Sequence, residues 1–460
     1  SRAAAPVAGP NAATPSSFTE SENPLLMNLA RYFLQSEAMS LLNRLEQVQP
    51  FSLSMPMVAA ASISDEAARA VTDHLLVNCR SLKQGMRHFL QFLQSPQAAT
   101  LSDDALQSRH ATLKMRFNAI LDQFDIFADV ISQRSEHNTG VWIAGLDMLA
   151  TDALHLNGDF FEAPPVMCFL ERGHGAAIRR ARTRLPGGDM NPVAIIQVPR
   201  ERMVGSGIAA SLIHEVGHQG AALLDLVATL RAAMRSTSIP PSQQRAWTLY
   251  NLWISEIIAD FWAMAHLGVG ASLGLMSVVS LPRYFMFRVS ATDPHPFPWI
   301  RVELSLAFGE RLFPHPQWKI MRSLWRRLYP VKGLPLPTRR VLEELEACMP
   351  AFTNLIVNHR NERTRGQPLA TLFPLRERQP ERLKQMFAEW RQQPSRLPLD
   401  QPSLVFAVVG QARVNTAIGA NEESRLLSRL LAQWAWMRSE NRRVRQSPPR
   451  LLRAMRNFIS

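Results

Sequence analysis

Two histidines and a glutamate, His214, Glu215 and His218, have the spacing of a metal-binding helix. They lie in residues 206–235, whose apolar residues recur at three- and four-residue intervals, so we expect one long amphipathic helix there. Residues four apart lie one turn above each other, and the imidazoles of His214 and His218 therefore share a face. Two such nitrogens can bind one Zn²⁺ while Glu215 accepts a proton from its bound water. The alternative is a solvated helix face with two incidental histidines.

Two carboxylates occupy the apolar stretch 253–262, where Glu256 and Asp260 lie one helical turn apart. Burying carboxylates is costly unless each has a cation or a donor as partner. Zinc provides that partner for Glu256 as a third protein ligand, and the free N–H of a zinc-bound histidine provides it for Asp260. The alternative is a helix with two salt-bridged acids.

A histidine between prolines follows in residues 293–301. The prolines restrict the backbone around His295, and Arg301 comes six residues later. A fixed histidine and an arginine are groups that a site stabilising an oxyanion would need. Taken alone, this stretch is as typical of a rigid surface turn before a helix, and its position after the other two motifs favours the site.

The three motifs together, His-Glu-Val-Gly-His, Glu-Ile-Ile-Ala-Asp and His-Pro with a later Arg, resemble those of the gluzincin metallopeptidases. The order is most similar to that of the group containing the CAAX prenyl endopeptidases and the HtpX-type peptidases. The resemblance covers roughly residues 190–310, and it implies a zincin-like core and a zinc-dependent endopeptidase.

The resemblance also implies a role for each motif residue. It makes His214, His218 and Glu256 the zinc ligands, Glu215 the general base, and Asp260 the carboxylate that bonds His214 from behind.

By the same resemblance, His295 and Arg301 lie on the substrate side and steady the tetrahedral oxyanion or the site itself. A nearby tyrosine such as Tyr284 is a further candidate for the oxyanion.

Composition limits the class of protein and its partners. The 460 residues carry a net charge of +13, and 46% of them are hydrophobic. This charge suits nucleic acid, an anionic membrane or an acidic partner, but no nucleic-acid-binding signature is present, so a protein or peptide substrate is favoured. Three widely separated cysteines, Cys79, Cys168 and Cys348, form no disulfide framework, which favours a reducing compartment and a cytoplasmic location.

The expected fold is mainly α (α+β), with a small sheet in the zincin-like core and helical domains on either side. A strand at 193–198, flanked by prolines, is expected at the edge of the sheet. By analogy with peptidases of this fold, the backbone of the substrate would pair with that edge. The expected parts are a flexible arm (1–20), a helical N-terminal domain (21–135), the metallopeptidase core (136–325) and an Arg-rich helical C-terminal domain (326–460).

Other functions stay open at this stage. A catalytically silent zincin-like scaffold in a larger assembly is one, although a purely structural site has no need of Glu215. A delivered or secreted protease effector is another. A membrane-bound processing protease would depend on the uncharged residues 261–281, which are explained as well by two buried helices joined by a Gly-rich turn.

Overall fold

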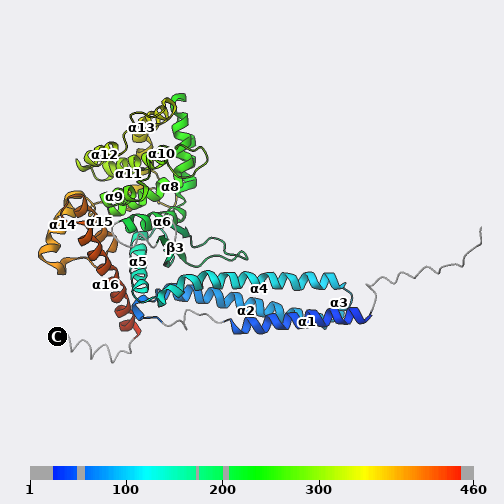
Figure 1. The fold of residues 1–460 in the computed structure, drawn as a ribbon. Coiled ribbons are helices and arrows are strands. Elements are labelled where there is room, and N and C mark those ends of the chain that lie inside the picture. The colour runs from blue at the N-terminus through cyan, green and yellow to red at the C-terminus, as the bar shows by residue number, and fades with distance from the viewer. Residues whose placement is uncertain (1–23, 49–56, 172–175, 200–206, 447–460) are drawn as a thin grey trace, which may run out of the picture. The chain divides into compact units, whose positions relative to one another are not determined.

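The computed structural model describes residues 24–48, 57–171, 176–199 and 207–446, and the expected flexible arm (1–20) lies outside them (Figure 1). The chain divides into two compact units, residues 1–50 with 75–123 and residues 51–74 with 124–460. These units differ from the expected domains, whose boundaries at 135/136 and 325/326 stay a prediction about independently folding parts.

The smaller unit is helical. Three long helices run side by side in it, and apolar residues of each form its core (Figure 1). The core residues are Leu34, Ala38, Phe89, Leu93, Ala98 and Leu106. The helices that lie wholly or partly in this unit are α1 (Pro24–Gln47), α2 (Asp65–Leu93), α3 (Pro96–Ala99) and α4 (Asp103–Ser132).

The larger unit is also mainly helical and contains one small sheet, as the sequence predicts. Its strands are β1 (Val166–Glu171), β2 (Ala177–Arg179) and β3 (Ala194–Pro199). Its helices before residue 313 are α5 (His137–Leu154), α6 (Gly207–Leu223), α7 (Leu226–Ser236), α8 (Gln244–Leu267), α9 (Val269–Val279), α10 (Arg283–Met286) and α11 (Pro298–Leu312). The later helices are α12 (Gln317–Leu328), α13 (Leu336–Val357), α14 (Pro380–Gln392), α15 (Pro402–Val414) and α16 (Ala420–Gln446).

The strand order in the sheet is β1-β3-β2, with β1 parallel and β2 antiparallel to β3. The expectation that the strand at 193–198 is an edge strand is therefore wrong. Pro192 precedes β3 and Pro199 is its last residue, so the residues between them keep the N–H groups that pair on both sides. Among the described strands, β2 is an edge strand that contacts α6.

The expected single helix over 206–235 is two helices. Asp225 adopts a left-handed conformation (φ 51°) between α6 and α7. The side-chain amide of Asn361 donates to the carbonyl oxygen of Leu224 at 2.8 Å, which satisfies a backbone group that the break leaves unpaired.

Close packing of α6 on α8 brings the motif residues together. A Cβ on Gly217 would lie 2.8 Å from the Cα of Ala259, and one on Gly220 would lie 2.2 Å from the Trp262 ring. Only glycine allows the two helices to approach this closely, because side chains at these positions would overlap atoms of α8.

Residues 261–279 form the end of α8, a turn at Gly268 and helix α9, as the interpretation of this stretch as two helices joined by a Gly-rich turn predicts. The side chains of α8 from Phe261 to Leu267 are buried, as are most of those in α9. Among the described residues, none of the helices is both long enough and apolar enough to cross a membrane.

Candidate metal centre

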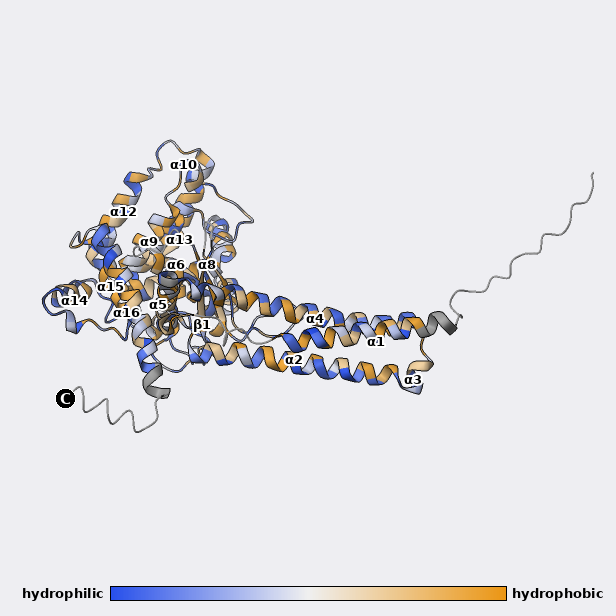
Figure 2. Cartoon of the chain, turned by 60° about the horizontal axis from the view of Figure 1, so that its bottom comes forward, coloured by the Kyte–Doolittle hydropathy of each residue, from blue (hydrophilic) through white to orange (hydrophobic). Residues whose placement is uncertain are grey.

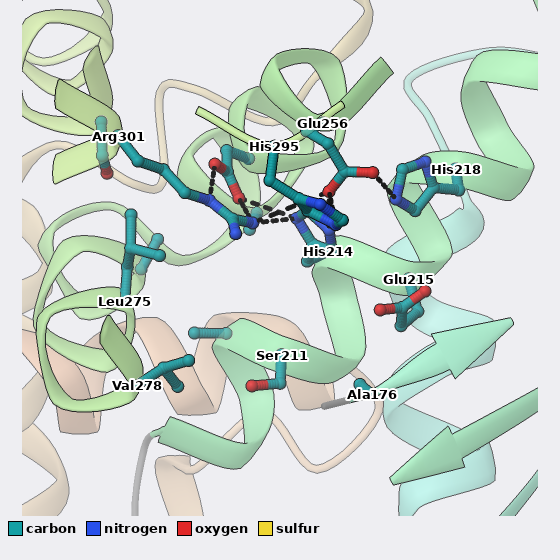
Figure 3. A pocket seen from close by; sticks show the side chains of 15 residues that line it. Ala176, Ser211, His214, Glu215, His218, Glu256, Leu275, Val278, His295 and Arg301 are labelled. Atoms are coloured by element: carbon teal, nitrogen blue, oxygen red, sulfur yellow. Dashed lines mark hydrogen bonds and ion pairs between the residues drawn. The ribbon is translucent and has the colours of Figure 1, made fainter. Parts of the chain in front are cut away.

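Helices α6 and α8 place three candidate ligands around one point. The ligating atoms of His214, His218 and Glu256 all lie within 4.8 Å of one another. The Glu256 carboxylate lies between the two rings, with Oε2 3.1 Å from His214 Nε2 and Oε1 3.4 Å from His218 Nε2 (Figure 3). The structure therefore brings together the two motifs that are 42 residues apart in the sequence.

This donor set fits a zinc ion. Ligand atoms around a tetrahedral Zn²⁺ with bonds of about 2.0–2.1 Å lie about 3.4 Å apart. The two separations from Glu256 to the histidines, 3.1 and 3.4 Å, are close to that value. Two imidazoles and one carboxylate also form a ligand set that leaves a fourth position for water.

Asp260 and Arg301 hold His214 from behind. The Asp260 Oδ1 atom accepts a hydrogen bond from His214 Nδ1 at 2.7 Å, which leaves Nε2 of that ring for a metal. Arg301, on α11, donates from Nε to Asp260 Oδ2 at 2.6 Å and from Nη2 to Oδ1 at 2.9 Å. This bidentate pair fixes the carboxylate that orients the ring, and the Arg301 side chain also lines the cavity.

His295 lies at the rim of the same centre. Its Nε2 is 3.6 Å from Glu256 Oε2, and its side chain is 55% exposed. The carboxylate of Asp293 accepts from the backbone N–H of His295 at 2.9 Å and lies 3.0 Å from its Nδ1. The prolines thus restrict the backbone, while Asp293 orients the ring.

Tyr284 is not brought to the centre, contrary to the expectation that it could serve the oxyanion. Its side chain is 73% exposed, and it does not line the cavity that contains the histidines. The reason is that α9 ends at Val279 and the chain has left the cavity before it reaches Tyr284 in α10.

The charges of the centre are strongly coupled. Burial lowers the pKa of His214, but the Asp260 and Glu256 carboxylates outweigh it and raise that pKa to about 9. Burial raises the pKa of Glu256, and the neighbouring His214 outweighs it and lowers the pKa to about 2. A histidine must be neutral to bind a metal, so metal binding displaces the proton that these carboxylates hold on His214.

The pKa of His218 shifts in the opposite direction. Burial and the charge of His214 lower it to about 4, so the His218 ring is neutral near pH 7. Its Nδ1 lies 3.3 Å from the hydroxyl oxygen of Ser255, which leaves Nε2 directed at Glu256.

Glu215 lines the cavity beside the ligands without binding to a neighbour. Its side chain is buried, and among the described residues it has no hydrogen-bond or ion-pair partner. Burial, together with the nearby Glu256 charge, raises the pKa of this carboxyl. A carboxyl that opens onto a cavity and whose pKa is raised is a better proton acceptor than an ordinary carboxylate and can return the proton.

The cavity has a volume of about 320 Å³ and two kinds of wall. One wall is the polar centre itself. The other is formed mainly by small and aliphatic side chains of α6, α8 and α9, and Figure 3 shows Leu275 and Val278 on this side. Its members are Ala210, Ala263, Ala271, Leu275 and Val278.

Sequence reasoning missed several of these residues. Ser255 directly precedes Glu256, and Asp293 lies two residues before His295. This closeness to the motifs could have indicated them, but neither serine nor aspartate is diagnostic of such a site. The apolar wall gave no signal, because alanine, leucine and valine in α8 and α9 are typical of any buried helix. Ala176, which lines the cavity directly before β2, belongs to none of the motifs.

The chain matches no family model, no curated protein sequence and no solved structure.

Proposed function

We propose that this chain is a zinc-dependent endopeptidase with a zincin-like core. The observation that carries the proposal is the convergence of His214, His218 and Glu256 within 4.8 Å, in a cavity that Glu215 also lines. The chemistry of these donors favours Zn²⁺, and Asp260 supplies the partner that a metal-binding histidine requires.

A zinc ion bound by these residues would lower the pKa of a water molecule and polarise the scissile carbonyl. Glu215 accepts the proton of the attacking water and then donates it to the leaving amine. His295, at the rim, is the chain's own candidate donor to the developing oxyanion. Arg301 acts through Asp260, because its guanidinium is already engaged by that carboxylate.

The substrate backbone is placed along β2. Its outer edge is unpaired among the described strands, and Ala176, the residue before it, lines the cavity. An extended peptide can add to such an edge through main-chain hydrogen bonds. The substrate is thus a protein segment able to become extended.

A catalytically silent scaffold would not explain Glu215. A buried carboxylate without a partner in the described structure is costly to the fold, and a structural metal site gains nothing from it. The cost is explained if Glu215 handles a proton during the reaction.

The test is Glu215→Gln, with Glu343→Gln on α13 as the matched control. A peptide library incubated with the zinc-loaded chain identifies a cleaved sequence, and its cleavage rate is then measured by mass spectrometry for each variant. We expect Glu215→Gln to retain zinc and to lose about a hundredfold or more in rate. The exposed Glu343 should be replaceable without effect. Full cleavage by zinc-loaded Glu215→Gln would refute the assignment of the base.

A further inference from the structure

Helix α12 has an apolar face on each side. Its inner side chains Trp318 and Trp325 are fully buried in the larger unit. On the outer side Ile320, Leu324 and Leu328 recur every four residues and are 68%, 44% and 57% exposed. Packing within the larger unit explains why the inner face is apolar, but it does not explain the apolar residues of the outer side.

The segment of Leu281 and α10 is attached to the end of α12 and carries further exposed apolar residues. Leu281, Tyr284 and Phe285 are all exposed, and Figure 2 shows orange residues on both α10 and α12. The Tyr329 hydroxyl donates to the carbonyl oxygen of Leu281 at 3.0 Å, which fastens the two segments together. The outer face comprises seven exposed apolar residues, Leu281, Tyr284, Phe285, Ile320, Leu324, Leu328 and Val331.

The charge around the outer face has one sign. Residues 281–288 and 317–340 contain nine lysines and arginines and no aspartate or glutamate. Two of the nine, Arg322 and Arg326, are paired with three carboxylates of neighbouring helices, Glu303 and Glu310 on α11 and Glu346 on α13. Lys319 and Arg327 have no carboxylate partner in the described part of the chain, and both are exposed. Arg327 lies two turns after Ile320, on the same side of the helix.

We propose that the outer face binds the surface of an anionic membrane. Its aliphatic and aromatic side chains enter the boundary between headgroups and acyl chains, and the lysines and arginines around them reach the lipid phosphates. Each such cation adds to the attraction of the chain to an anionic surface. No transmembrane helix is required for this kind of binding.

The composition of the face favours lipid over a macromolecular partner. Charged residues are depleted from the core of protein–protein interfaces, whereas lysines and arginines border the apolar residues of helices that lie in a membrane interface. Single-stranded nucleic acid needs aromatic platforms for its bases, and most of the outer face is aliphatic.

The outer face also begins where the cavity wall ends. Leu275 and Val278 of α9 line the cavity, and Leu281 follows α9 directly. If the proposed peptidase activity holds, a substrate emerging from a bilayer would reach the cavity along this segment. Membrane binding itself does not depend on that activity.

The experiment is co-sedimentation of the full chain with phosphatidylcholine vesicles, with and without phosphatidylglycerol. The test variant is Leu324→Glu/Leu328→Glu. The matched control is Val77→Glu/Met115→Glu, which changes two residues of the smaller unit that are 55% and 73% exposed. Circular dichroism and urea unfolding establish that each variant is folded before its binding is measured.

We expect the chain to bind the anionic vesicles and to bind the neutral ones at least about tenfold more weakly. The test variant should lose at least about tenfold in partition coefficient, and the control should not. A second variant, Lys319→Glu/Arg327→Glu, should lose about tenfold or more by the same assay.

Three results would overturn the proposal. One is the absence of binding to anionic vesicles, and another is undiminished binding by the folded test variant. The third is binding to an acidic polypeptide such as polyglutamate but not to vesicles, which would assign the face to an acidic protein partner. Because none of these measurements involves peptide cleavage, they fail or succeed separately from the proposed enzymatic activity.

Discussion

Gly217→Ala tests whether the spacing of α6 and α8 builds the centre. Gly217 lies between the two histidines of the motif, and an added Cβ would lie 2.8 Å from Ala259 Cα, 2.8 Å from Trp262 Cβ and 3.0 Å from Ala259 O. Two of these three atoms are backbone atoms and cannot rotate away. The helices would therefore have to separate by roughly half an ångström to reach ordinary van der Waals contact.

Two opposing energies decide the effect of this change on stability. Alanine is favoured over glycine within a helix by up to about 1 kcal/mol, whereas overpacking costs about 1–3 kcal/mol. We expect a net loss of about 1–2 kcal/mol in the free energy of unfolding of the metal-free chain. The control is Gly207→Ala at the start of α6, where a Cβ would meet nothing within 4 Å, and we expect it to be neutral or slightly stabilising.

The same separation moves the histidines of α6 away from Glu256 on α8. Metal–ligand distances tolerate changes of only about 0.2 Å. We therefore expect Gly217→Ala to bind zinc about 10–100-fold more weakly than Gly207→Ala. Replacing residues that orient metal ligands has an effect of this size. Urea unfolding and competition with a chromophoric chelator measure the two quantities. If Gly217→Ala matched Gly207→Ala in both, the close contact of the helices would not be what positions the ligands.

Two further predictions concern buried charges. Arg301→Leu leaves the Asp260 carboxylate with only His214 as partner, and we expect it to lower the free energy of unfolding in urea by about 3–5 kcal/mol. The control, Arg245→Leu, breaks a more exposed pair with Glu344 and should lower it by less than about 1 kcal/mol. Equal losses in the two variants would refute the structural role of Arg301. Burial and the charge of Arg378 lower the pKa of His266 to about 3. Between about pH 3 and 6.5 this histidine is therefore protonated in the unfolded chain but not in the folded one. The free energy of unfolding consequently falls as the pH falls through that window. Relative to His266→Leu, the wild-type chain should therefore lose about 2 kcal/mol more in unfolding free energy between about pH 7 and 5, and parallel pH profiles would contradict this.

The local geometry of the centre could be predicted from the sequence. Residue pairs four apart on helices, His214 with His218 and Glu256 with Asp260, share a face whatever the rest of the fold does. That the two helices meet could not be read from periodicity. The close approach depends on the glycines at 217 and 220. From the sequence alone these residues indicate only a lower helix propensity, and their role is visible only once α8 is known to pack against them.

The break between α6 and α7 shows why other features of the fold could not be predicted from the sequence. No proline or glycine marks Asp225, and the residues around it suit a continuous helix. The partner of the unpaired Leu224 carbonyl is Asn361, which lies 137 residues later in the chain. Strand β2 was missed for a similar reason, since it has three residues, two of them exposed, and exists only through pairing with β3.

The most direct test of the central claim is the metal content of the purified chain, measured by mass spectrometry beside Glu256→Ala. Glu256 faces both histidines, so its removal should destroy the site while His214 and His218 remain in place. We predict one zinc ion per wild-type chain and none in the variant. Unchanged zinc in Glu256→Ala, or no zinc in a folded wild-type chain after reconstitution, would contradict the three-ligand centre and the peptidase proposed from it.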